Sequence, residues 1–247
     1  MQGNSQQQAY DRGITIFSPD GRLYQVEYAR EAVKRGTASV GVRTPDGVVF
    51  AASRSVRSPL MERDSVEKIH KADGHVGIAS AGHVADARKL IDVARQRAQV
   101  EHLRYDQPVS VETLTKAVTD HIQEYTQTGG ARPFGVALLV GGVDEDGQPR
   151  LFETDPSGTP YEWQAVAIGG KRGDIQSYLE EHYREELDLD GGVDLAIRAL
   201  ASVSDDPITA DDVDVATVDV ESGQYRSVPK EERERHVAEI DEEETDE

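Results

Sequence analysis

The sequence predicts an α+β fold, a four-layer αββα sandwich, from three observations. Short β-rich runs and helical segments follow one another as strands, two helices, strands, two helices and strands. Two consecutive helices are too many for a simple βαβ repeat. The run Phe134–Val143 is apolar on both faces, as expected of a central strand that is covered from both sides. Two sheets packed face to face, with a helix pair on each outer face, satisfy all three observations.

The chain is expected to begin with a polar, mobile arm over residues 1–12. Ser18-Pro19-Asp20-Gly21 then predicts a tight turn, because Pro pre-sets the second turn position and Gly suits the fourth. An apolar stripe predicts a helix from Arg22 to Arg35, which Gly36 ends.

The remaining elements follow from β-rich runs, turn residues and apolar spacings of three and four residues. Ser110 is expected to cap one helix, and Asp174 to cap another. Strands are expected at Ala38–Val42, Val48–Ala52, His75–Ser80, Phe134–Val143, Arg150–Thr154, Tyr161–Ile168, Val213–Val220 and Tyr225–Val228, and helices at 84–98, 111–125, 174–187 and 193–203.

The 247 residues contain no Pro/Gly/Ser-rich linker, so we expect a single domain over residues 13–229. Residues 230–247 predict a charged helix that passes into an acidic, disordered tail.

The composition excludes several classes of function. The net charge of −20, from 47 acidic and 27 basic residues, would repel nucleic acid and anionic membranes. The chain has no Cys, which removes thiol chemistry, and we expect no metal or cofactor. A polar N-terminus and the absence of a long apolar run predict a cytoplasmic protein. Seven Lys against 20 Arg, with the acid excess, indicates a high-salt cytoplasm; the alternative is an ordinary acidic protein.

Residues 10–32 read YDRGITIFSPDGRLYQVEYAREA, which resembles the N-terminal signature of proteasome α subunits, above all those of archaeal 20S particles. The similarity continues through SVEKI at 65–69, GHVADAR at 82–88, QEYTQTGGARPFG at 123–135 and TDPSG at 154–158. It covers about residues 8–230. The family has the αββα architecture of N-terminal nucleophile hydrolases, in agreement with the fold predicted above.

The resemblance implies a non-catalytic subunit. Family members form seven-membered outer rings that cap rings of catalytic β subunits, gate the entrance, dock activating AAA ATPases and pass unfolded chains inward. The partners implied are therefore other α subunits, β subunits, an ATPase and substrate proteins in transit.

Gate residues are implied by the same match. Tyr10, Asp11, Pro19 and Tyr28 correspond to the cluster that orders the N-terminal arm. A phenol can hydrogen-bond a carboxylate, and the Pro turn would position the arm. The alternative is that both tyrosines pack against a helix.

An activator-docking pocket is implied at Lys68 and Gly36. A lysine ammonium can hold the C-terminal carboxylate of an activator, and glycine allows close backbone approach. The alternatives are a solvated surface lysine and an ordinary helix stop. Thr128, Gly129 and Gly130 match the loop that narrows the channel, although the family often has Tyr in place of Thr128; the alternative is a plain flexible turn.

Catalysis by this chain is not expected. Thr37 lies at the position of the β-subunit nucleophile, but 36 residues precede it, so its nitrogen is held in a peptide bond and cannot act as the base. The acidic partner's position falls on Ser53, and only Lys68 lies near a catalytic position. Two other hypotheses remain: a β-like hydrolase that processes itself before Thr37, and a solitary acidic binding module.

Overall fold

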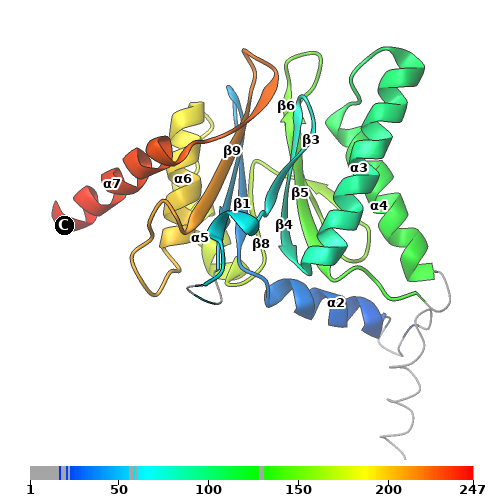
Figure 1. Ribbon diagram of the computed structural model, residues 1–247, viewed down its shortest axis with the longest axis horizontal. Coiled ribbons are helices and arrows are strands. Elements are labelled where there is room, and N and C mark those ends of the chain that lie inside the picture. Colours follow the sequence, from blue (N-terminus) through cyan, green and yellow to red (C-terminus); the bar gives the residue numbers. More distant parts are fainter. Residues whose placement is uncertain are drawn as a thin grey trace, which may run out of the picture.

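The computed structural model describes residues 17, 21, 23–55, 58, 60–127 and 131–246, which form four layers (Figure 1). Two antiparallel sheets lie face to face, and a helix pair covers the outer face of each. This arrangement confirms the predicted αββα sandwich.

The first sheet has the strand order β10-β9-β2-β1-β8. Its strands are β1 (Ser39–Thr44), β2 (Gly47–Ser53), β8 (Ala165–Ile168), β9 (Val213–Asp219) and β10 (Gln224–Ser227). The predicted hairpin of β1 and β2 is present, with Val42 opposite Val49 and the turn between Thr44 and Gly47. All residues of β1 and β2 except Arg43 and Ser53 are buried, so both faces of these strands are covered and both strands lie inside the sheet.

The second sheet has the strand order β3-β4-β5-β6-β7. Its strands are β3 (Ile69–Asp73), β4 (Val76–Gly82), β5 (Val136–Val143), β6 (Pro149–Thr154) and β7 (Pro160–Glu162). Every residue of β5 is buried, which confirms the central, doubly covered strand predicted from its continuous apolar run.

Helices α3 (Val84–Tyr105) and α4 (Val111–Gln127) cover the second sheet, and α5 (Arg172–His182) and α6 (Leu189–Ala201) cover the first (Figure 1). Ser110 caps α4 as predicted, because its Oγ atom accepts a hydrogen bond from the Thr113 amide at 3.2 Å. A further helix, α2 (Tyr24–Lys34), lies across one end of the sandwich, and the 3₁₀ turn η1 (Arg63–Ser65) precedes β3.

Three apolar cores hold the layers together. The core between the sheets contains large side chains with no exposed surface, among them Phe50, Leu139 and Leu151, and it also receives Val33 from α2. Each outer core joins a sheet to its helix pair. Full burial of one such side chain contributes about 1.5–3 kcal/mol, so these three interfaces supply most of the stabilising free energy.

One strand is missing from the prediction, and two predictions about the elements are wrong. Strand β3 was not predicted, because its sequence Ile-His-Lys-Ala-Asp is polar and it lies at a sheet edge. The run Tyr161–Ile168 forms two strands, β7 and β8, which belong to different sheets. Asp174 does not cap α5; the helix starts one turn earlier, after Lys171, whose φ of 53° is left-handed.

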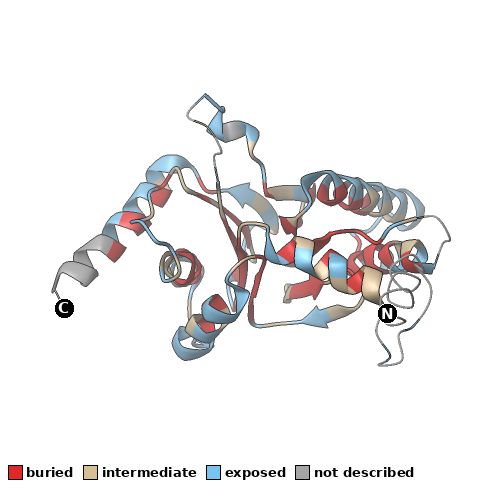
Figure 2. Ribbon diagram, turned by 90° about the horizontal axis from the view of Figure 1, so that it is seen from below, coloured by how far each residue is buried: buried red, intermediate tan, exposed pale blue. Residues whose placement is uncertain are grey.

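The chain ends in α7 (Lys230–Asp246), which projects away from the body (Figures 1 and 2). This helix extends through the segment that was expected to be a disordered acidic tail. Among the described residues, no helix combines the length and the apolar character needed to cross a membrane.

Candidate functional site

The expected site residues that the structure describes gather at the end of the sandwich crossed by α2. Figure 2 looks onto this end, where α2 lies in front of the sheets and packs one buried face against them. Val26, Ala29 and Val33 form that face, as the apolar stripe predicts. Helix α2 contacts β4 and β5, and the chain then passes through Gly36 and Thr37 into β1.

The salt bridge between Arg30 and Asp155 fixes α2 in this position, and Glu27 on the same helix orients the Arg30 side chain. The Arg30 guanidinium contacts Asp155 at 2.7 Å and Glu27 at 2.5 Å. Asp155 begins the turn after β6, and its other oxygen accepts a hydrogen bond from the Ser157 amide at 3.1 Å. The helix is therefore joined to the edge of the second sheet by a hydrogen-bonded turn as well as by apolar burial.

Lys68 is buried against the start of β1. Its Nζ atom lies 2.7 Å from both Thr37 O and Thr37 Oγ1, 2.9 Å from Ala38 O and 3.4 Å from Ser53 O. Its relative exposure is 8%, so the interpretation as a solvated surface lysine is wrong. The Ser80 amide donates to Lys68 O at 3.0 Å and fixes the backbone against β4.

The environment of Lys68 changes its titration. Burial lowers the pKa of Lys68 to about 7, and the negative charge of Asp214 limits the shift. Near neutral pH the amine therefore exchanges between a charged form, which suits the surrounding oxygens, and a neutral form.

Gly36 makes a close backbone contact, as its residue type predicts. A Cβ atom at Gly36 would lie 2.9 Å from Gly82 Cα and still closer to the Gly82 nitrogen. Gly82, with φ of 118°, in turn lies directly against the Gly135 carbonyl. The Gly170 amide also donates to Gly36 O at 2.8 Å. Glycine is thus required here by contact between backbones, in addition to its role in ending α2.

A buried carboxylate holds the segment that enters β5. Asp86, in the first turn of α3, accepts hydrogen bonds from Arg132 at 2.6 and 2.8 Å and from the Gly135 amide at 2.9 Å. Burial raises the pKa of Asp86, but these hydrogen bonds lower it by more, so the pKa lies below its ordinary value. Asp86 and Arg132 both lie in segments that carry the family resemblance, yet only the structure pairs them.

Tyr28 lies on the outer side of α2, with 51% of its surface exposed. The other expected gate residues, Tyr10, Asp11 and Pro19, lie outside the described residues, as do Thr128, Gly129 and Gly130 of the expected constriction.

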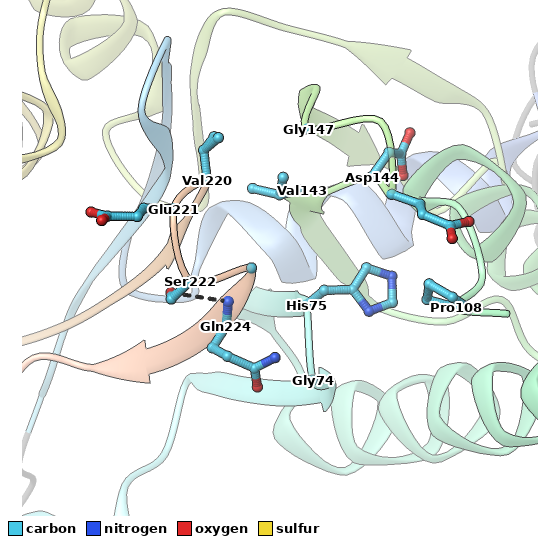
Figure 3. A pocket seen from close by; sticks show the side chains of 12 residues that line it. Gly74, His75, Pro108, Val143, Asp144, Gly147, Val220, Glu221, Ser222 and Gln224 are labelled. Carbon is cyan, nitrogen blue, oxygen red and sulfur yellow. Dashed lines mark hydrogen bonds between the residues drawn. The ribbon is translucent and has the colours of Figure 1, made fainter.

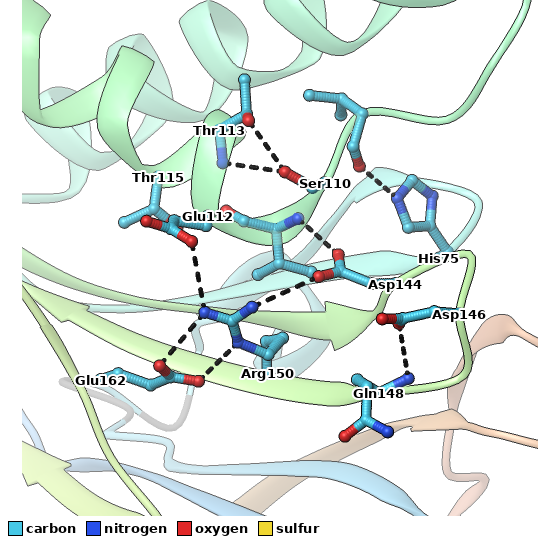
Figure 4. A network of polar contacts seen from close by, with 12 residues as sticks. His75, Ser110, Glu112, Thr113, Thr115, Asp144, Asp146, Gln148, Arg150 and Glu162 are labelled. Carbon is cyan, nitrogen blue, oxygen red and sulfur yellow. Dashed lines mark hydrogen bonds and ion pairs between the residues drawn. The ribbon is translucent and has the colours of Figure 1, made fainter.

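The opposite end of the sandwich carries a cavity of about 380 Å³ between three hairpin turns (Figure 3). Its lining includes His75, Asp144, Val220 and Gln224. Two of these side chains belong to a structural network (Figure 4). Asp144 accepts from the Val111 amide at 2.8 Å, and His75 Nε2 lies 2.8 Å from Val109 O. These contacts hold the start of α4 against the second sheet.

In the same network, Arg150 contacts Glu162 at 2.6 Å and Glu112 at 3.4 Å (Figure 4). Its polar groups are thus engaged in joining β6 to β7 and α4. The expected functional residues lie at the other end, and that end is the candidate site.

Comparison with known proteins decides the family. A family model for the proteasome subunit matches residues 33–218, and a model for the N-terminal signature of A-type proteasome subunits matches residues 10–32. The chain belongs to the proteasome subunit family.

Relatives of this proteasome protein are α-type subunits of halophilic archaea. The proteasome alpha subunit 1 of Haloarcula marismortui is 71% identical over 98% of this chain and 92% of the relative. The proteasome alpha subunit of Natronomonas pharaonis is also 71% identical, over 98% of this chain and 94% of the relative. The proteasome alpha subunit 1 of Haloferax volcanii is 69% identical over 96% and 94%. The α-type identity and the halophilic character predicted from the sequence are confirmed.

Proposed function

We propose that this proteasome α subunit forms seven-membered outer rings that cap rings of catalytic β subunits, gate substrate entry and dock a regulatory AAA ATPase. One observation carries the proposal: the α-type signature at residues 10–32 includes most of α2, which occupies the end of the sandwich where a β-type nucleophile would be exposed. Further α subunits, β subunits, an ATPase and unfolded proteins are the proposed partners, and the cytoplasm is the proposed location.

The proposed subunit is not itself a protease. The Thr37 nitrogen lies within the chain, between α2 and β1, so it is an amide without basicity. Lys68 contacts the Thr37 hydroxyl, but Ser53 at the third position has no carboxylate. A lysine beside the Thr37 hydroxyl cannot replace the free amine that this chemistry needs.

Lys68 and Gly36 are proposed to form the floor of an activator-docking pocket. The Lys68 ammonium lies beside Thr37, and the neighbouring Gly36 adds no side chain. A charge-assisted hydrogen bond to a C-terminal carboxylate is stronger than a bond to a neutral carbonyl. The entering carboxylate would therefore compete successfully with the carbonyl oxygens that now surround Nζ.

The arm and the loop of the channel are proposed to act on the substrate path. Tyr10, Asp11 and Pro19, with Tyr28 on α2, would order the arm in its open state. Thr128, Gly129 and Gly130 would narrow the channel. The Asp86–Arg132 salt bridge supports the latter role, because it holds Arg132, two residues after this segment, in place.

The test is to co-purify the full chain with a β-type proteasome subunit in high salt. We expect sevenfold end views by electron microscopy, and an intact mass that includes residues 1–36 apart from terminal trimming. Deleting residues 2–12 should raise the hydrolysis of a fluorogenic peptide, whereas Thr37→Ala should leave it unchanged. A purified chain that begins at Thr37 would instead identify a self-processing β-type protease, and unchanged peptide entry after the deletion would remove the gating role.

A further inference from the structure

Helix α7 is held to α6 by few contacts. Its sequence from Lys230 is dominated by Glu and Arg, and its apolar contribution to the outer core consists of Val237 and Ile240. Figure 2 shows buried positions along only one side of the helix, which otherwise points away from the body. Polar contacts therefore matter for how firmly this helix packs. Near its start, Arg233 donates a hydrogen bond to Val213 O and Lys230 contacts Asp211 at 2.8 Å.

The shortest polar contact between α7 and α6 among the described residues is made by His236, which has 2% exposure. Its Nδ1 atom lies 2.6 Å from Asp194 Oδ1, and its Nε2 atom lies 3.5 Å from Asp190 Oδ1. The two aspartates are four residues apart and so face α7 from the same side of α6.

Carboxylates at both ring nitrogens favour the doubly protonated ring. A neutral imidazole carries one N–H group, so it would direct a lone pair at one of the two negative oxygens. The imidazolium carries an N–H group at each nitrogen, so it can donate to Asp194 and also offset the negative charge of Asp190. Its hydrogen bond to Asp194 raises the pKa of His236 above its ordinary value, burial opposes this shift, and the charges of Asp194 and Asp190 support it.

Among the described residues, four charged side chains face or adjoin the ring. Asp190 and Asp194 come from α6, and Arg235 and Glu239 from α7 itself. Arg235 lowers the pKa of His236, but it also contacts Asp190 at 3.5 Å. The negative groups outnumber the positive one, so a proton on His236 is favoured from both helices.

The same atoms do not suit a metal ion as they stand. Asp194, His236 and Glu239 could each offer one ligand atom. Zinc bonds of about 2.0–2.2 Å would hold ligand atoms roughly 3 Å or more apart, whereas Asp194 and His236 are at hydrogen-bonding distance. The short contact is that of a hydrogen bond between the ring nitrogen and the carboxylate.

We propose that His236, Asp194 and Asp190 form a proton-controlled clamp that fastens the C-terminal helix α7 to α6. Loss of the proton leaves a buried neutral ring facing two carboxylates, and α7 then loosens while the four-layer body stays folded. The clamp is independent of the proposed ring and gate functions.

The direction of the pH dependence follows from the raised pKa. The clamp contributes fully below the ordinary histidine value of 6.5 and is lost as the pH rises through the higher folded value. Weakening is therefore expected on the alkaline side of neutrality, by about tenfold in the opening equilibrium for each unit by which the pKa is raised.

The test is hydrogen exchange of the full chain, measured by mass spectrometry in high salt from about pH 6 to pH 9 and corrected for intrinsic exchange. We expect peptides from α7 to lose protection with rising pH while peptides from β5 keep theirs. His236→Gln should make α7 open and pH-independent. The matched control is His182→Gln, at an exposed histidine that hydrogen-bonds the Tyr178 carbonyl in α5, and it should behave as wild type.

Two outcomes would overturn the clamp. One is pH-independent protection of α7 in the wild-type chain, or an NMR titration that puts the His236 pKa at or below its ordinary value; this titration needs no variant. The other is loss of α7 protection on adding EDTA at about pH 6.5, restored by Zn²⁺, which would show that a metal ion and not a proton fastens the helix.

Discussion

The Nζ atom of Lys68 lies 2.7 Å from the Oγ1 atom of Thr37. The same ammonium also contacts the backbone carbonyls of Thr37 and Ala38, so one buried charge ties the segment before β3 to the first residues before β1. The family resemblance implies that these two residues lie near the positions of a threonine nucleophile and its lysine partner. Here their contact joins two segments of the chain.

Replacement of Lys68 by Met should therefore destabilise the protein. Met keeps much of the length of the side chain but leaves the carbonyls of Thr37 and Ala38 without donors, at a cost of about 2–3 kcal/mol. Denaturant unfolding in high salt measures this loss. Lys34→Met is the control, because Lys34 is exposed and pairs with Glu31 on its own helix. This variant should lose less than about 0.5 kcal/mol of stability. Equal stabilities of the two variants would mean that the contacts of Lys68 contribute nothing.

Docking of a C-terminal carboxylate at Lys68 should weaken as the pH rises above 7. The pKa of Lys68 is about 7 in the free protein, and a bound carboxylate would raise it. Below pH 7 the amine is already charged and affinity is highest. Above it, binding must take up a proton, and affinity falls by up to about tenfold per pH unit.

Fluorescence anisotropy with a labelled peptide that copies the C-terminus of a regulatory ATPase measures this affinity in the assembled rings. The amidated peptide should bind weakly at every pH, and Lys68→Arg should remove the pH dependence, because arginine stays charged. If the peptide with a free C-terminal carboxylate and the amidated peptide bind with equal affinity, Lys68 does not recognise the carboxylate.

A methyl group at Gly36 should be costly. In Gly36→Ala, the new Cβ atom would collide with the Gly82 backbone, which no rotamer change can relieve, and we expect a loss of about 1–3 kcal/mol. Gly173→Ala, in the first turn of α5 with open space around it, should be neutral or stabilising by up to about 1 kcal/mol. Thermal unfolding measures the stability of both variants. If Gly36→Ala is as stable as the wild type, the two backbones can move apart at little cost in free energy.

Asp86→Asn should loosen the segment from Arg132 to Gly135. The change removes the charge that receives both Arg132 nitrogens, and we expect a loss of about 1.5–3 kcal/mol at neutral pH. Because the pKa of Asp86 is lowered in the folded state, its contribution is present above the ordinary value of 3.8 and is lost as the pH falls through the folded value.

The variant should therefore lose less stability than wild type on acidification below about pH 4. Asp92→Asn, at an exposed position of the same helix, is the control and should follow the wild-type curve. Parallel acid curves for Asp86→Asn and wild type would exclude Asp86 as a contributor.

Local patterns predicted most of the fold. The apolar stripe of α2, the cap at Ser110 and the continuous apolar run of β5 each indicate the local structure directly. Strand β3 could not be recognised, because an edge strand needs no apolar face and its pairing with β4 is a long-range choice. The division of residues 161–168 between two sheets also depends on tertiary pairing.

The site was predicted less completely, for the same reason. The residue types of Lys68 and Gly36 were informative, but burial of Lys68 against Thr37 runs against the usual behaviour of lysine. The Asp86–Arg132 pair spans 46 residues, so no local spacing connects its members. Contacts of this kind follow from the packing of helices on sheets and are visible only once the layers are assembled.

The backbone contacts among Gly36, Gly82 and Gly135 affect how a displacement is transmitted through this end of the sandwich. Main chain touches main chain at this junction, and no side chain lies between the segments to absorb a displacement by changing rotamer. A push on the C-terminal end of α2 is therefore passed on rigidly to the β4–α3 connection and to the strand entry at Gly135. Through these glycines, three segments that are distant in sequence are in direct backbone contact. A displacement of one segment is therefore expected to displace the other two.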